Sequence, residues 1–198
     1  MSAPDPLAGY GDASQPAWDK EIDHLDRHCR AFIGISPWLT LGTADADGFP
    51  DVSPRGGEPG FVKVLDDSRL VLPDRPGNNR VDSLRNVTAN PRVALMFVAP
   101  GINETLRVFG TAALVPADEV DVDLTEFGRP PRSALVVQVQ RAYFQCARSL
   151  LRSGLWEPEK WPGRGDLAPM GVVFRDHCRL PAPLPPDEVM HADLAQHL

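Results

Sequence analysis

The sequence predicts a mixed α+β fold, mainly β, in which six or seven antiparallel strands form a barrel with flanking helices. Short apolar segments separated by turn residues recur over residues 38–116 and again from residue 133. Strands joined by such short turns pair antiparallel, because a parallel pair needs a long crossover connection. Three or four segments with helical spacing accompany the strands. The chain of 198 residues is long enough for one such domain with its own core.

The first helix is expected over residues 17–33, where apolar residues recur at helical spacing. They are Trp18, Ile22, Leu25, Cys29 and Phe32. Residues 38–45 alternate in polarity as a strand does, and the turn at 46–48 predicts a hairpin with residues 49–53. Residues 54–61 are too rich in glycine and proline for regular structure.

The middle of the chain predicts further strands and one helix. Residues 61–73 are expected to form a strand, a turn and a second strand, followed by a loop and a helix to about Thr88. Residues 90–101 predict a strand whose run Val93–Val98 is apolar throughout, so that both of its faces should be covered.

The last part of the predicted barrel begins with a long strand over residues 104–116. Gly110 within it predicts a bulge or a close backbone approach. Residues 117–128 predict a short acidic helix, and residues 133–144 predict a strand that continues into a helix.

The 21 prolines of the chain concentrate near its ends. We therefore expect an irregular arm at residues 1–16, a barrel domain at residues 17–163 and a proline-rich extension at residues 164–198.

Composition narrows the functional classes. A formal net charge of −7 argues against nucleic acid as a partner, because duplex binding needs a dense cationic surface. We expect a soluble, cytoplasmic protein without a membrane partner, since no secretory signal and no bilayer-length apolar stretch occurs. The three cysteines form no C-x-x-C pair and are expected to be small buried or half-buried residues. His24 and His28 lack a third candidate ligand, so no metal is expected.

The stretch PDRPGNNR, residues 73–80, stands at a strand-to-helix junction and combines two arginines with a glycine and two asparagines. Arg75 and Arg80 could donate to phosphate oxygens, Gly77 permits close backbone approach, and Asn78 or Asn79 could cap the helix. Free amides at a helix start also favour an anion. The alternative is a proline–glycine turn with two solvated arginines.

Several motifs in order resemble one protein family. The segments WLTLGTADADGFPDVSPRG, LVLPDRPGNNRVDSLRN, NPRVALMFVAPG, ETLRVFGTA and CARSLLRSGLW are similar to the FMN-binding split-barrel proteins related to pyridoxamine 5′-phosphate oxidase. The resemblance covers about residues 17–162 and points to a branch of FMN-dependent enzymes. It implies a split barrel, a bound FMN and a homodimer with the site at the subunit interface.

The resemblance also implies site residues. Arg80, helped by Asn79 and Arg75, would bind the FMN phosphate, and Pro73 and Asp74 would line the ribityl chain and the ring.

Other strand ends contribute to the same implied site. The segment with Ser53 and Arg55 would follow the isoalloxazine ring or reach the phosphate, and Glu104 or Thr105, with Arg107 close by, would supply a polar group. Trp156 and Arg152 would close the site from the other subunit. No side chain is expected to act as a catalytic acid or base, because the flavin carries the redox chemistry.

The chain departs from the vitamin B6 oxidases near its C-terminus. It lacks their Arg-x-His cluster, which grips the substrate phosphate, so pyridoxamine 5′-phosphate oxidation is not expected. The leading hypothesis is an FMN-dependent oxidoreductase that acts on a small molecule and takes electrons from a nicotinamide. The alternatives are an F420-dependent reductase of the same fold, a flavin- or haem-binding module without turnover, and a barrel that serves only for interaction.

Overall fold

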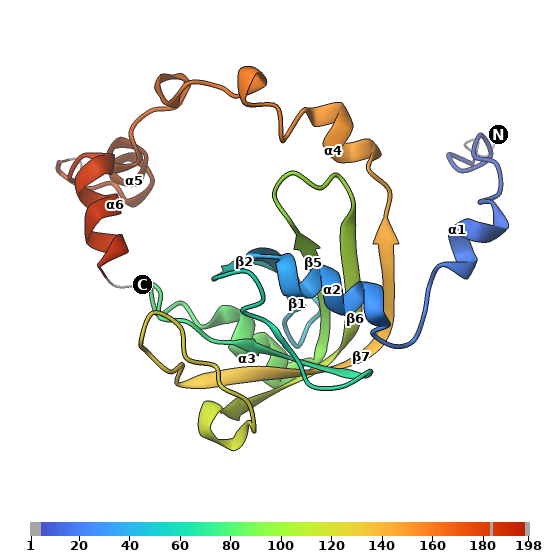
Figure 1. Ribbon diagram of the computed structural model, residues 1–198. Coiled ribbons are helices and arrows are strands. Elements are labelled where there is room, and N and C mark those ends of the chain that lie inside the picture. Colours follow the sequence, from blue (N-terminus) through green and yellow to red (C-terminus); the bar gives the residue numbers. More distant parts are fainter. Residues whose placement is uncertain (1–4, 183, 197–198) are drawn as a thin grey trace.

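Seven antiparallel strands form one sheet in the computed structural model, which describes residues 5–182 and 184–196. Their order is β2-β1-β5-β6-β7-β4-β3. The sheet curls into a barrel that stays open between its edge strands β2 and β3 (Figure 1). The strands are β1 (Trp38–Ala44), β2 (Pro50–Gly56), β3 (Lys63–Val64), β4 (Arg69–Pro73), β5 (Arg92–Val98), β6 (Thr105–Pro116) and β7 (Ser133–Gln145). The predicted fold class and the predicted hairpins are confirmed.

Six α-helices accompany the sheet in the part of the chain that the structure describes. They are α1 (Gln15–Asp19), α2 (Arg27–Ile35), α3 (Asp82–Ala89), α4 (Arg148–Ser153), α5 (Met170–Cys178) and α6 (Asp187–Ala195). Helices α2 and α3 place their apolar faces in the core, which is made of buried residues from both helices and from the inner faces of the strands. Amphipathic helices thus cover part of the open barrel.

The single helix predicted over residues 17–33 is wrong. The chain leaves α1 at Lys20, and Ile22 forms an isolated antiparallel bridge with Ala142 of β7. Asp26 then starts α2 by accepting hydrogen bonds from the backbone of His28 and Cys29. The extended segment between α1 and α2 also turns Ile22 and Leu25 toward the core, so the helical spacing of apolar residues did not reveal the break between the two helices.

The acidic helix predicted over residues 117–128 is also wrong. Only Ala117–Glu119 form a single 3-10 turn, and the chain then runs as a loop to β7. Within that loop, Glu126 and Arg129 exchange backbone hydrogen bonds across a tight turn. The segment is therefore the long loop that joins the neighbouring antiparallel strands β6 and β7, with a hairpin tip. It is called the β6–β7 loop below.

Gly110 combines both features that its position predicted. The register between β6 and β7 shifts between Phe109 and Gly110, which marks a bulge. A Cβ atom added at Gly110 would lie 2.0 Å from the carbonyl oxygen of Gln138, so the two backbones approach too closely for any side chain.

Beyond Trp156 the chain runs away from the barrel, and α5 and α6 lie together to one side (Figure 1). Asp187 connects the two helices, because its carboxylate accepts from the backbone of Met170 and pairs with Arg164. The division of the chain at residues 16 and 163 stays a prediction. Within the described residues, no helix is long and apolar enough to cross a bilayer.

Candidate functional site

One group of candidate residues lies at the opening of the barrel, where β2 faces the loop after β4. Along β2, alternate residues are half-buried, so Asp51, Ser53 and Arg55 share its inner face. Asp51 accepts a hydrogen bond from Ser83 of α3, and Arg55 reaches Asp74. This row of polar side chains therefore lines the opening.

Arg55 forms a half-buried ion pair with Asp74. Its Nη1 donates to Asp74 Oδ1 over 3.1 Å, and Asp74 follows the buried Pro73 at the end of β4. The Nε of Arg55 is buried without a hydrogen-bond partner. Arg55 thus keeps one buried donor without a partner beside the opening.

Arg75 is held by the β6–β7 loop. Its Nη2 donates to the carbonyl oxygen of Leu124 over 2.8 Å and lies 3.0 Å from Glu126 Oε2, while Nη1 donates to the carbonyl oxygen of Arg129. The Nε of Arg75 is buried and unpaired, and Glu126 Oε2 is within ion-pair distance of Arg75 but accepts no hydrogen bond. The unpaired buried side-chain atoms of the described residues are therefore Arg55 Nε, Arg75 Nε and Glu126 Oε2, all in this cluster.

Glu126 stands at the tip of a two-residue hairpin turn. Phe127 and Gly128 form the turn with φ values of 50° and 73°, the left-handed conformation that such tight turns require. The turn directs the Glu126 side chain inward, where only 5% of it is exposed.

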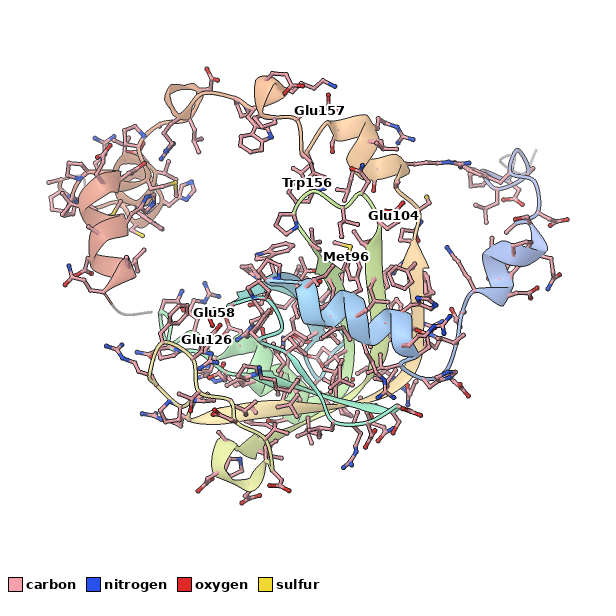
Figure 2. All side chains as sticks on the ribbon, in the orientation of Figure 1. Glu58, Met96, Glu104, Glu126, Trp156 and Glu157 are labelled. Carbon is pink, nitrogen blue, oxygen red and sulfur yellow. The ribbon has the colours of Figure 1, made fainter. Side chains whose placement is uncertain are left out.

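The backbone after β2 receives the Glu126 carboxylate. The amide N–H of Glu58 donates to Glu126 Oε1, and the two residues lie together at the edge of the barrel in Figure 2. A Cβ atom at Gly57 would lie 2.7 Å from both carboxylate oxygens. Glycine at this position therefore makes room for the carboxylate.

The loop before α3 is more open than the sequence suggested. Asn79 adopts a positive φ of 59°, and Arg80 is 77% exposed and pairs with Asp82 over 2.8 Å. The N-cap of α3 is Val81, and no side chain caps the helix; Asn78 instead accepts from the backbone of Arg80. The expectation that Asn78 or Asn79 caps α3 is wrong, so the first amides of the helix keep their capacity for an anion.

Each predicted phosphate-binding arginine has an acidic partner. The pairs are Arg55 with Asp74, Arg75 with Glu126, and Arg80 with Asp82. The cluster is therefore close to neutral. Its remaining capacity for an anion consists of the two unpaired Nε donors and the start of α3.

A second group surrounds an apolar cavity of about 550 Å³ on the outer side of the sheet. Strands β1, β5 and β6 supply one wall, and α4 with the chain that follows it supplies the other. The lining residues are Trp38, Met96, Val98, Pro100, Thr105, Gln145, Ser149, Leu150, Leu155 and Trp156. Met96 is 37% exposed, so the expectation that both faces of β5 are covered is wrong for this side.

The predicted residues of the C-terminal half divide between this cavity and the surrounding surface. Thr105 and Trp156 line the cavity, whereas Glu104 and Arg152 are exposed beside it. Arg107 lies 4.9 Å from the ring of Phe109 and takes part in a cation–aromatic stack on the outer face of β6. In Figure 2, Met96 and Trp156 lie well apart from Glu58 and Glu126. The predicted site residues therefore form two separate groups within one chain.

The cysteines differ from one another. Cys29 is buried as expected, and burial raises the pKa of its thiol to about 12. Cys146 and Cys178 are exposed, which corrects the expectation for both. The pKa of Cys146 is lowered, first by the backbone N–H of Arg148.

Sequence reasoning missed Glu126, Trp38 and Met96. Glu126 was assigned to a helix, although Gly128 and the two prolines that follow it are turn signals. The sequence places Trp38 and Met96 in strands, and no local signal distinguishes them from core residues.

This chain is similar to several known proteins. The family model described as pyridoxamine 5′-phosphate oxidase matches residues 25–146. A pyridoxine/pyridoxamine 5′-phosphate oxidase of Anaeromyxobacter dehalogenans (strain 2CP-C) is 28% identical over 188 residues, which are 95% of this chain and 74% of that protein. Among solved structures, HupZ from Group A Streptococcus is 17% identical with a TM-score of 0.45, over 60% of this chain and 92% of that one. An FMN-binding protein from Syntrophomonas wolfei is 15% identical with a TM-score of 0.43, over 59% and 83%.

Proposed function

Because this chain belongs to the pyridoxamine 5′-phosphate oxidase family, whose model matches more than half of it, we propose that it is an FMN-dependent oxidoreductase acting as a homodimer. A relative named as an oxidase supports the general class of reaction. The substrate is a small molecule, and a nicotinamide is the proposed electron donor.

The observation that carries the proposal is the pair of unused arginine donors at the barrel opening. Arg55 Nε and Arg75 Nε are buried and unpaired, and the uncapped start of α3 lies on the same loop. Buried donors without partners destabilise a protein unless a ligand supplies acceptors. A phosphate group offers such acceptors and would reach the two Nε atoms once the side chains that cover them shift, so the residues present fit the phosphate end of FMN.

In this proposal the protein binds and orients the cofactor, and bound FMN supplies the electron-transfer chemistry. Arg55, Arg75 and Arg80 would hold the phosphate together with Asn79 and the amides of α3. Since Asp74, Glu126 and Asp82 already balance these arginines, a phosphate must share each guanidinium with a carboxylate. We therefore expect weaker FMN binding than an unbalanced arginine cluster would give.

A homodimer would unite the two groups of site residues. Ser53, Pro73 and Asp74 of one subunit would face Thr105 and Trp156 of the other, with Glu104, Arg107 and Arg152 nearby. The C-terminal arm supports a second copy, because several of its large apolar side chains are exposed on the isolated chain. They include Leu151, Trp161, Leu167, Phe174, Val189 and Leu194.

Titration of the purified protein with FMN, followed by quenching of flavin fluorescence, tests the proposal. Arg55→Gln removes a charge-assisted donor and should weaken FMN binding roughly tenfold to hundredfold. Arg85→Gln is the matched control, because the Arg85 side chain is 76% exposed on the neighbouring helix and lies 3.9 Å from Asp82. Equal FMN affinity in both variants, or no saturable binding by the wild-type protein, would refute the proposal.

The chromophore that copurifies with the protein decides between FMN, F420 and haem. Denaturation should release FMN, identified by its absorption spectrum and mass. Reduction by a nicotinamide under nitrogen and reoxidation in air should then proceed at a useful rate. A bound flavin that neither accepts nor returns electrons would instead identify a binding module.

A further inference from the structure

The cavity between the outer face of the sheet and the α4 segment has the size of a small-molecule binding site. We propose that it binds a neutral, planar, apolar molecule of about two fused rings, which is the substrate class of the oxidoreductase. This inference rests on the proposed function for the reaction, but the binding itself can be tested alone. A volume of about 550 Å³ is typical of small-molecule sites.

The chemistry of the walls determines the substrate class. Seven lining residues are apolar, and the other three, Thr105, Gln145 and Ser149, are polar but uncharged. An ionised group would lose its hydration in this cavity without meeting an opposite charge. The three polar side chains suffice to bind a carbonyl or hydroxyl oxygen.

Two tryptophans give the cavity flat walls. Trp38 begins β1, and Trp156 belongs to the chain that returns from α4 to the barrel. A planar ligand gains more contact than a branched one against such surfaces. Trp156 is fixed in place, because its Nε1 donates to the carbonyl oxygen of Ile102 over 2.9 Å.

The backbone at the end of α4 builds the outer wall. Gly154 adopts a left-handed conformation with a φ of 60° and ends the helix, and its N–H reaches back to the carbonyls of Leu150 and Leu151. The chain thereby reverses and brings Leu155 and Trp156 to the cavity. This wall is part of an ordered helix end.

Exposed apolar side chains meet at this cavity. Trp38 is 39%, Met96 37% and Leu155 44% exposed, and all three line it. A folded chain gains nothing from keeping three large apolar side chains accessible at one point unless something binds there. In the proposed homodimer the cavity would face the cofactor opening of the other subunit, because Thr105 and Trp156 line it.

The same walls exclude phosphorylated substrates. No lining residue carries a charge, and the guanidinium of Arg107 stacks on Phe109 and Tyr143 instead of entering the cavity. A phosphate ester such as pyridoxamine 5′-phosphate would therefore remain uncompensated here.

Calorimetric titration with naphthol and naphthalene sulfonate tests this inference, because the two probes share a ring system and differ in charge at neutral pH. The wild-type protein should bind naphthol saturably and the sulfonate at least tenfold more weakly. Met96→Glu and, independently, Leu155→Asp should each weaken naphthol binding at least tenfold. Leu114→Glu is the control, since Leu114 is 40% exposed on β6 but lies outside the cavity.

FMN titration of the same variants separates this inference from the proposed function. FMN affinity should fall much less than naphthol affinity in Met96→Glu and Leu155→Asp, because neither side chain is among the proposed FMN contacts. Parallel loss of FMN and naphthol would assign the cavity to the flavin and overturn the inference. Absence of naphthol binding to the wild type, with Met96→Glu converting a dimer to monomers, would assign it to a second copy of the chain. Equal binding of both probes would also overturn it.

Discussion

Replacement of Gly57 by alanine should displace the buried carboxylate of Glu126. The new methyl group would lie 2.7 Å from both carboxylate oxygens and 2.7 Å from the Cβ of Phe61, well inside van der Waals contact. Overpacking of this kind costs about 1–3 kcal/mol, and loss of the Arg75–Glu126 pair adds to it. Arg75 keeps its bonds to two backbone carbonyls, so we expect a total loss of about 2–4 kcal/mol.

Urea denaturation followed by far-UV circular dichroism measures this loss. At a typical slope of about 2 kcal/mol per molar urea, the midpoint should fall by roughly 1–2 M. Gly56→Ala is the control, because the nearest atoms to its Cβ lie at 3.5 and 3.6 Å, which is ordinary contact. In the Gly57→Ala protein, Glu126→Asp should recover stability by withdrawing the carboxylate, although the same change destabilises the wild type.

Equal stability of the Gly56→Ala and Gly57→Ala proteins would refute this account of the cluster. So would a Glu126→Asp substitution that costs the same free energy in both backgrounds, because no coupling between the two positions would then exist.

Three further predictions concern the frame around the site. Gly110→Ala should lower the free energy of unfolding by about 3 kcal/mol or more in urea denaturation, because its Cβ would lie 2.0 Å from the carbonyl oxygen of Gln138; a loss below 1 kcal/mol would contradict this. Asp26→Ala should cost about 1 kcal/mol at neutral pH by removing the cap of α2. Hydrogen bonds, first from the backbone of Cys29, hold the pKa of Asp26 below 3.8 in the folded state. The contribution of Asp26 to the free energy of unfolding is therefore present above the unfolded pKa and is lost as the pH falls through the folded pKa. A difference in stability between wild type and Asp26→Ala that persists in acid would count against the cap. A thiol reagent at neutral pH should modify Cys146 before Cys29, because the pKa of Cys146 is lowered and that of buried Cys29 is about 12. Peptide mapping identifies the modified cysteine, and modification of Cys29 first would contradict this prediction.

The sequence predicted features that depend on local backbone chemistry. Turn residues located the hairpins, and Gly110 marked the bulge because a missing side chain is a local requirement. The break between α1 and α2 was missed, because Ile22 bridges to Ala142 in a strand more than a hundred residues away. Asp26, an N-cap residue in type, was the one local signal of that break.

The candidate site was only partly predictable for the same reason. The composition of the loop at residues 73–80 predicts an anion site, since arginine, asparagine and glycine have intrinsic properties there, and that site stays a prediction. Two of the ion pairs could not be foreseen, because Arg55 meets Asp74 through the curl of the sheet and Arg75 meets Glu126 through the β6–β7 loop. If the arginines before α3 are counted as free cations from the sequence, the positive charge of the opening is therefore overestimated.

The paired charges at the opening should make FMN affinity insensitive to salt. A dianionic phosphate that approaches Arg55 and Arg75 meets Asp74 and Glu126 at the same time, so part of the Coulomb attraction is offset by repulsion. Salt screens both the attraction to the arginines and the repulsion from the carboxylates. The net electrostatic contribution to binding therefore depends less on ionic strength than it would in a cluster of arginines without acidic partners. If FMN binds here, its affinity should thus change little between low and physiological salt, whereas binding dominated by free arginines would weaken steeply.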